Sequence, residues 1–145
     1  MGYKITKKDY KNFIDYALKT GFDDKDFAKE HLHYLIHLFN DLPDPVRLHR
    51  IIFLSKKSDF RKDEPGSHYS LDKNKLVDNH YLMDQLNDYA EFNDSKPYIL
   101  TIESPKSKID FDETINNNLA YPNEEEITLK EKGKGTNFIS LERIR

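Results

Sequence analysis

The chain has 145 residues, which is the length of one domain, because domains commonly contain roughly 100 to 200 residues. Its formal charge of -3 at pH 7 disfavours bulk nucleic-acid binding, which depends on a basic face. The absence of cysteine excludes disulfide scaffolds, Cys-ligated zinc and thiol nucleophiles.

The chain contains no apolar run approaching the roughly 20 residues that span a bilayer. Its first residues also lack the apolar centre of a signal peptide. We therefore expect a cytoplasmic, monomeric protein without a membrane partner. A single domain should cover residues 1–145, with a helical part at 1–44 and a sheet-rich part at 45–145.

Two helices are predicted in the N-terminal part. The first begins at a capping-box-like pattern, Thr6 with Asp9, and ends at Gly21. The second runs from about Asp24 to Leu42, before two prolines. Residues at helical spacing predict the buried stripe of this second helix: Phe27, His31, Tyr34, Leu35, Leu38 and Leu42.

Residues 46–54 then predict a strand, on which Val46, Leu48 and Arg50 share one face. A short second strand is expected at 66–71. Another apolar stripe at helical spacing predicts a third helix: Leu82, Met83, Leu86, Tyr89 and Ala90.

The C-terminal part is expected to be mainly strand. Residues 98–102 are apolar and β-branched, whereas 104–118 carry Pro, Lys, Asp and three consecutive Asn and predict an irregular connection. Residues 124–129 and 137–144 predict two strands that form a terminal hairpin, with the glycines at 133 and 135 at its tip.

Three consecutive glutamates open the first of these two strands. Alternation along a strand places Glu124 and Glu126 on one face and Glu125 on the other. Paired carboxylates repel each other, a cost that is tolerated where a cation, a metal or a cationic transition state is the occupant. A solvated acidic strand edge that discourages aggregation is the other interpretation.

Other polar residues are candidates for binding. Arg50 lies among apolar neighbours, where a guanidinium either pairs with a carboxylate or binds a phosphate or carboxylate ligand. His68 and Ser70 follow a glycine that permits close backbone approach. His33 and His37 are spaced to clip a metal, but without a third ligand cluster we interpret them as a solvated helix face.

The order of these segments resembles the mono-ADP-ribosyltransferase family of the arginine-serine-glutamate type. The matching stretches are a strand with Arg50, a short strand at 66–70 and the Glu-x-Glu segment at 121–129, so that the resemblance covers residues 45–145. His68-Tyr69-Ser70 stands where the family usually has Ser-Thr-Ser. Arg50 is preferred to Arg47 because His49 precedes it, in the place of an aromatic residue of the family.

The resemblance implies an α+β fold in which two packed, mainly antiparallel sheets form an NAD cleft, with the N-terminal helices at one side. NAD would be the substrate, and ADP-ribose would pass to a protein acceptor, on arginine, with release of nicotinamide. Glu126 would stabilise the positive charge of the transition state, and Glu124 would steer or deprotonate the acceptor. Arg50, His68 and Ser70 would bind NAD.

Two other functions fit the residues. The first is a noncatalytic acidic interaction or inhibitor protein that binds a basic partner. The second is a metal-dependent hydrolase that uses Glu124, Glu126 and a histidine. For the transferase, the expected settings are a phage, a toxin-antitoxin system or an injected effector.

Overall fold

Antiparallel strands form one sheet with the order β4-β2-β1-β3-β5 in the computed structural model, which describes residues 3–78, 84, 88, 94–122 and 125–144. The long strands are β1 (Val46–Leu54), β3 (Lys96–Ser104) and β5 (Asn137–Arg143), and the short strands are β2 (His68–Ser70) and β4 (Glu126–Thr128). The α+β class is confirmed. All of these strands belong to a single sheet, so the expected pair of packed sheets is not confirmed.

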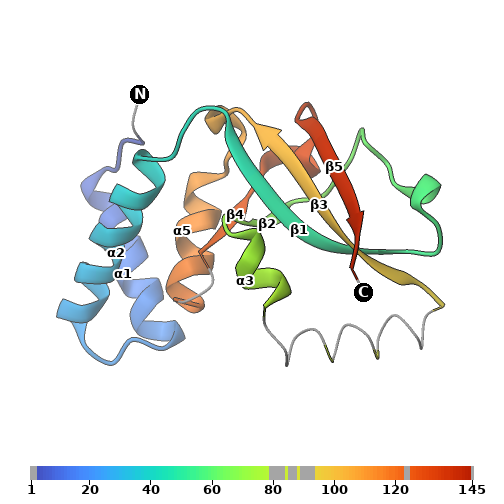
Figure 1. Ribbon diagram of the computed structural model, residues 1–145. Helices are drawn as coiled ribbons and strands as arrows, with labels where there is room; N and C mark the ends of the chain where they lie inside the picture. The colour runs from blue at the N-terminus through green and yellow to red at the C-terminus, as the bar shows by residue number, and fades with distance from the viewer. Residues whose placement is uncertain (1–2, 79–83, 85–87, 89–93, 123–124, 145) are drawn as a thin grey trace.

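Three helices pack together beside the sheet. They are α1 (Lys7–Thr20), α2 (Lys25–Asn40) and α5 (Phe111–Ala120), and α5 lies between the other two helices and the strands (Figure 1). A shorter helix, α3 (Lys73–Val77), follows β2, and single 3-10 turns occur at η1 (Lys57–Asp59), η2 (Lys106–Lys108) and η3 (Lys130–Gly133). Apolar side chains of α1, α2 and α5 share one core with the sheet.

The first helix is confirmed at both ends. The Thr6 side chain accepts a hydrogen bond from the backbone N–H of Asp9, and the N–H of Gly21 donates to the carbonyl of Ala17. These two interactions satisfy backbone groups that a helix end otherwise leaves unpaired. None of the helices in the described part of the chain is both long and apolar enough to cross a membrane.

The second helix occurs as predicted, and Leu35 of the predicted stripe is buried, but the stripe as a whole is displaced by one position. The buried residues of α2 are Ala28, Leu32, Leu35 and Phe39, whereas Phe27 is 64% exposed and Tyr34 is 49% exposed. Two stripes one position apart have the same helical spacing, and packing against α1 and α5 selects the one that contains the small Ala28. An aromatic face of α2 therefore stays at the surface.

The segment 104–118, predicted as an irregular connection, contains most of the ten-residue helix α5, which extends to Ala120. Asp110 caps it by accepting a hydrogen bond from the N–H of Glu113. The helix buries polar residues beside its apolar ones: Thr114, Ile115, Asn118 and Leu119. Because half of the buried face is polar, the apolar periodicity of the sequence does not reveal it.

The predicted terminal hairpin is also wrong. β4 pairs with β2 and β5 pairs with β3, so that the two strands lie at opposite edges of the sheet. The glycine turn between them packs against the segment before β2. A Cβ atom at Gly133 would lie 2.5 Å from the carbonyl oxygen of Gly66. The third predicted stripe, at 82–90, falls on positions that lie outside the described residues.

Candidate functional site

A row of polar side chains crosses four neighbouring strands. Glu126 of β4 pairs in register with Ser70 of β2, Ser70 pairs with His49 of β1, and His49 pairs with Thr101 of β3. Residues paired in this way point to the same face of a sheet. We call these four residues the polar row. Their neighbours along the strands, Leu48, Tyr69 and Ile127, are buried, so the polar row lies on the face of the sheet opposite that part of the core. It brings together segments that are far apart in the sequence.

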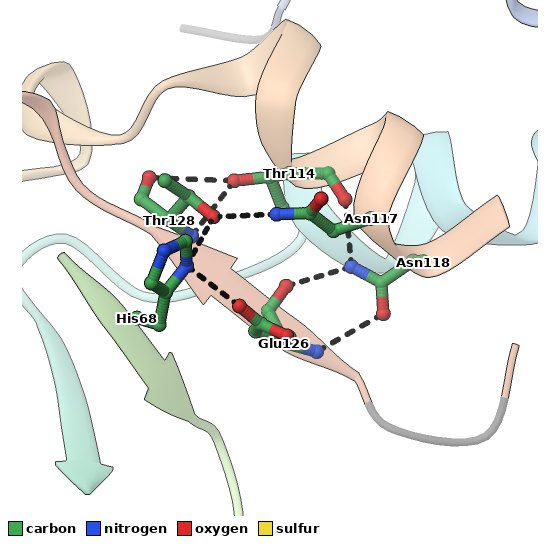
Figure 2. Close-up of polar contacts among 6 residues, drawn as sticks. All are labelled: His68, Thr114, Asn117, Asn118, Glu126 and Thr128. Carbon is green, nitrogen blue, oxygen red and sulfur yellow. Dashed lines mark hydrogen bonds and ion pairs between the residues drawn. The ribbon is translucent and has the colours of Figure 1, made fainter. Parts of the chain in front are cut away.

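The Glu126 carboxylate has a close partner. Its Oε1 lies 2.7 Å from Nδ1 of His68, on the adjacent strand (Figure 2). The Glu126 side chain is 24% exposed and that of His68 is 58% exposed, so the pair is open to solvent. Nδ1 of His68 also lies 3.3 Å from the Thr128 hydroxyl, and its contact with Oε1 orients the Glu126 carboxylate.

The backbone of Glu126 is fixed by Asn118 of α5. The Asn118 amide nitrogen donates to the Glu126 carbonyl over 2.6 Å, and the Glu126 N–H donates to Oδ1 of Asn118 over 3.0 Å (Figure 2). Asn118 is fully buried. β4 is an edge strand, whose outer backbone groups have no neighbouring strand. Asn118 therefore takes the place of a strand at this position.

Side chains of α5 also take the place of a neighbouring strand at Thr128. Its backbone N–H donates to Oγ1 of Thr114 over 3.0 Å, and its hydroxyl accepts a hydrogen bond from Asn117 over 3.0 Å (Figure 2). Its carbonyl accepts from the N–H of Asp110 over 2.9 Å. The polar face of α5 thus satisfies the outer edge of β4 and sets the position from which Glu126 projects.

Glu125 anchors the segment that leads into β4. It has a positive φ of 48°, its carboxylate accepts a hydrogen bond from the Tyr34 hydroxyl over 3.0 Å, and it lies 3.7 Å from Nζ of Lys75. The hydrogen bond to the Glu125 carboxylate is the main cause that raises the pKa of Tyr34. Glu124, the other half of the predicted Glu-x-Glu pair, lies outside the described residues.

The two middle members of the polar row have distinct environments. The Ser70 hydroxyl donates to the Asp72 carbonyl over 3.2 Å, which fixes its orientation. Nδ1 of His49 lies 2.8 Å from the Thr101 hydroxyl. Burial, and then the charges of Lys73 and Arg47, lower the pKa of His49. The imidazole is therefore neutral at pH 7.

The structure does not bring Arg50 to the polar row. Arg50 follows the alternation of Leu48 onto the other face, as the strand pattern predicted, and its guanidinium lies 5.6 Å from the centre of the Tyr69 ring. A side chain at Gly66 would clash with this guanidinium. Burial raises the pKa of Tyr69 to about 12, and the nearby Arg50 charge opposes the rise. At the β1 position of the row, the structure has His49 instead.

The remaining candidates are separate from this site. His33 is exposed on α2, and its Nε2 lies 3.3 Å from the Tyr10 hydroxyl. His37 is exposed on the same helix. Within the described ranges, His, Asp and Glu side chains form no group of three or more that could hold a metal ion.

The sequence patterns do not single out two residues of the site. His49 enters them only as the neighbour of Arg50, although strand alternation already separates these two side chains. Asn118 was one of three consecutive asparagines that indicated a loop, and no sequence signal marks its role. Comparisons of the chain with protein-family models, curated proteins and solved structures find no match.

Proposed function

We propose that the protein is an NAD-dependent mono-ADP-ribosyltransferase that modifies arginine on a protein acceptor. The observation that carries the proposal is the polar row, in which Glu126, Ser70 and His49 lie side by side on three adjacent strands. Glu126 and Ser70 come from two of the stretches on which the resemblance to that family rests, and register pairing makes them direct neighbours.

The reaction needs a carboxylate beside the ribose. The bond between ribose C1′ and the nicotinamide nitrogen breaks, and its electron pair leaves with neutral nicotinamide. The sugar becomes oxocarbenium-like, so the Glu126 carboxylate stabilises a positive charge that the ground-state sugar lacks. A unit charge pair at about 4 Å is worth about 4 kcal/mol at an effective dielectric constant near 20, which corresponds to roughly a thousandfold in rate.

The neighbours of Glu126 would bind and orient NAD. In this proposal His68 holds Oε1 of Glu126 and directs the second oxygen to the ribose, and Ser70 binds beside it. His49, whose Nδ1 is engaged by Thr101, contributes Nε2 to a ribose hydroxyl. The acceptor guanidinium nitrogen then bonds to C1′ and releases a proton, for which Glu124 is the proposed acceptor.

The first experiment measures nicotinamide release from NAD by chromatography, with and without an arginine-containing acceptor. Glu126→Gln keeps the side-chain volume and should reduce the rate at least about a hundredfold. Glu113→Gln, an exposed carboxylate at the start of α5, is the matched control and should retain the activity. No nicotinamide release by the wild-type chain would reject the transferase and favour the noncatalytic acidic protein.

A further inference from the structure

A groove lies at the junction of α1 and α2, beside the candidate site. It has a volume of about 680 Å³ and is lined by residues of the turn between the helices and of one face of α2. Its aromatic members are Phe22, Phe27 and Tyr34, and the ring of His31 stacks between Phe22 and Tyr34 at 5.6 and 5.9 Å. Phe27 and Tyr34 are the large exposed side chains of this face.

The same groove carries negative charge. Asp23, Asp24 and Glu30 are among its lining residues, and the described residues that line it include neither lysine nor arginine. Burial lowers the pKa of His31, so that its ring adds no positive charge at pH 7. Nε2 of His31 is buried without a hydrogen-bond partner. The groove therefore combines aromatic faces with three carboxylates, of which that of Asp24 also caps α2 by accepting from the N–H of Asp26.

This combination suits one kind of ligand. An arginine guanidinium stacks on aromatic rings and forms paired hydrogen bonds with carboxylates, whereas an apolar ligand would form no hydrogen bond with them. The compact, strongly hydrated lysine ammonium fits such a surface less well. Charge and ring geometry thus favour an arginine-bearing peptide segment.

The groove is connected to the candidate catalytic segment through one side chain. The Tyr34 ring lines the groove, and its hydroxyl donates to the carboxylate of Glu125, the residue directly before Glu126. A segment bound against Tyr34 therefore lies beside the start of β4. The helix pair would present the acceptor to the end of the sheet where Glu126 projects.

We infer that the groove between α1 and α2 binds an arginine-bearing segment of the protein acceptor. The role of this segment as the acceptor rests on the proposed function, but binding of the segment does not require NAD. It assigns the exposed aromatic face of α2 to substrate recognition, separate from the polar row.

The test uses fluorescence anisotropy without NAD. The probe is a fluorescein-labelled peptide with two arginines in a glycine-serine context, and its matched versions carry lysine or neutral citrulline at the same places. The wild-type protein should bind the arginine peptide more tightly than the lysine peptide, and the citrulline peptide least. Binding should weaken as salt increases.

Two variants locate the binding. Phe27→Ala removes a 64% exposed ring and Glu30→Gln removes one charge, and each should weaken binding of the arginine peptide about threefold to tenfold. Ile139→Ala, which removes an exposed apolar side chain from β5, is the control and should bind as the wild type does. Equal binding by all of these proteins would overturn the inference, as would equal affinity for arginine and citrulline peptides.

A second measurement separates the two proposals. NAD hydrolysis without any peptide tests the proposed function, and the KM for the arginine peptide during ADP-ribose transfer tests the groove. Phe27→Ala should raise this KM about threefold to tenfold. Peptide binding through the groove by a protein that does not consume NAD would overturn the acceptor role and reject the transferase, while it would support the groove as a site for a basic partner.

Discussion

One side chain, that of Asn118, forms hydrogen bonds with both the N–H and the carbonyl of Glu126. An amide side chain offers the same donor and acceptor as a peptide group, so a single asparagine replaces one residue of a missing strand. The helix that carries Asn118 also packs against α1 and α2. The position of the candidate catalytic carboxylate is thus coupled to the helical layer.

Asn118→Ala should destabilise the protein and impair activity. The change removes the partners of two part-buried backbone groups of Glu126, and an unsatisfied buried group costs about 1 to 3 kcal/mol. Urea denaturation would measure the loss of stability, and nicotinamide release well below the melting temperature would measure the activity of the folded fraction. Activity of the folded fraction should fall because β4 is less well positioned.

The control for this variant is Asn117→Ala. Among the described residues, the Asn117 side chain donates only to the Thr128 hydroxyl, so its loss should be smaller, about 1 kcal/mol. Asn118→Asp tests the donor separately, since a carboxylate cannot donate to the carbonyls of Glu126 and Thr114. Equal stability of the Asn117 and Asn118 variants would show that the two hydrogen bonds between Asn118 and Glu126 do not hold β4.

Gly66→Ala should destabilise the protein by about 1 to 3 kcal/mol, because the residue has a positive φ of 118° and a side chain there meets the Arg50 guanidinium. The Arg50 side chain can move, so part of the cost is steric and part is backbone strain. In the Arg50→Ala background the cost of Gly66→Ala should be smaller, as a double-mutant cycle measured by thermal unfolding would show. Strict additivity would contradict the contact between the two positions.

The sequence predicted the elements better than their partners. The capped first helix and the strand at 46–54 follow from local signals, and both are confirmed. The pairing of β4 with β2 instead of β5 is a long-range choice, which depends on α5 covering one edge of β4. No local pattern at 124–129 contains that information.

The site was predicted in part for a similar reason. Ser70 and Glu126 were both candidates before their register was known, and the structure places them side by side. The resemblance points to Arg50 on this strand and not to His49. Strand alternation alone excludes His49 and Arg50 from the same face. The role of a buried asparagine such as Asn118 leaves no pattern in the sequence, because its partner is a backbone group, which every residue type has.

Calorimetric titration of NAD distinguishes the two candidates on β1. His49→Ala should weaken NAD binding about threefold to tenfold, because it removes one neutral hydrogen bond from the polar row. Arg50→Ala should lower the melting temperature, since it removes the contact with the Tyr69 ring, and should leave NAD affinity within about threefold. Arg47→Ala, which breaks the ion pair with Glu103, is the control. Loss of NAD binding in Arg50→Ala alone would restore Arg50 as the ligand of NAD.

Stability should decrease as the pH falls below about 6.5, because burial lowers the pKa of His49 and His31 in the folded chain. With the folded pKa below the unfolded one, the unfolded chain binds more protons between the two values, so the stabilisation is complete above pH 6.5 and is lost on acidification. His49→Gln should reduce the slope of unfolding free energy against pH between pH 7 and 5.5, where one proton corresponds to at most about 1.4 kcal/mol per pH unit. Urea denaturation at several pH values measures the slope, and the measurement at pH 8, where the imidazole is neutral, isolates any loss of packing. An unchanged slope would mean that His49 has the same pKa in the folded and unfolded chains, contrary to its partial burial in the polar row.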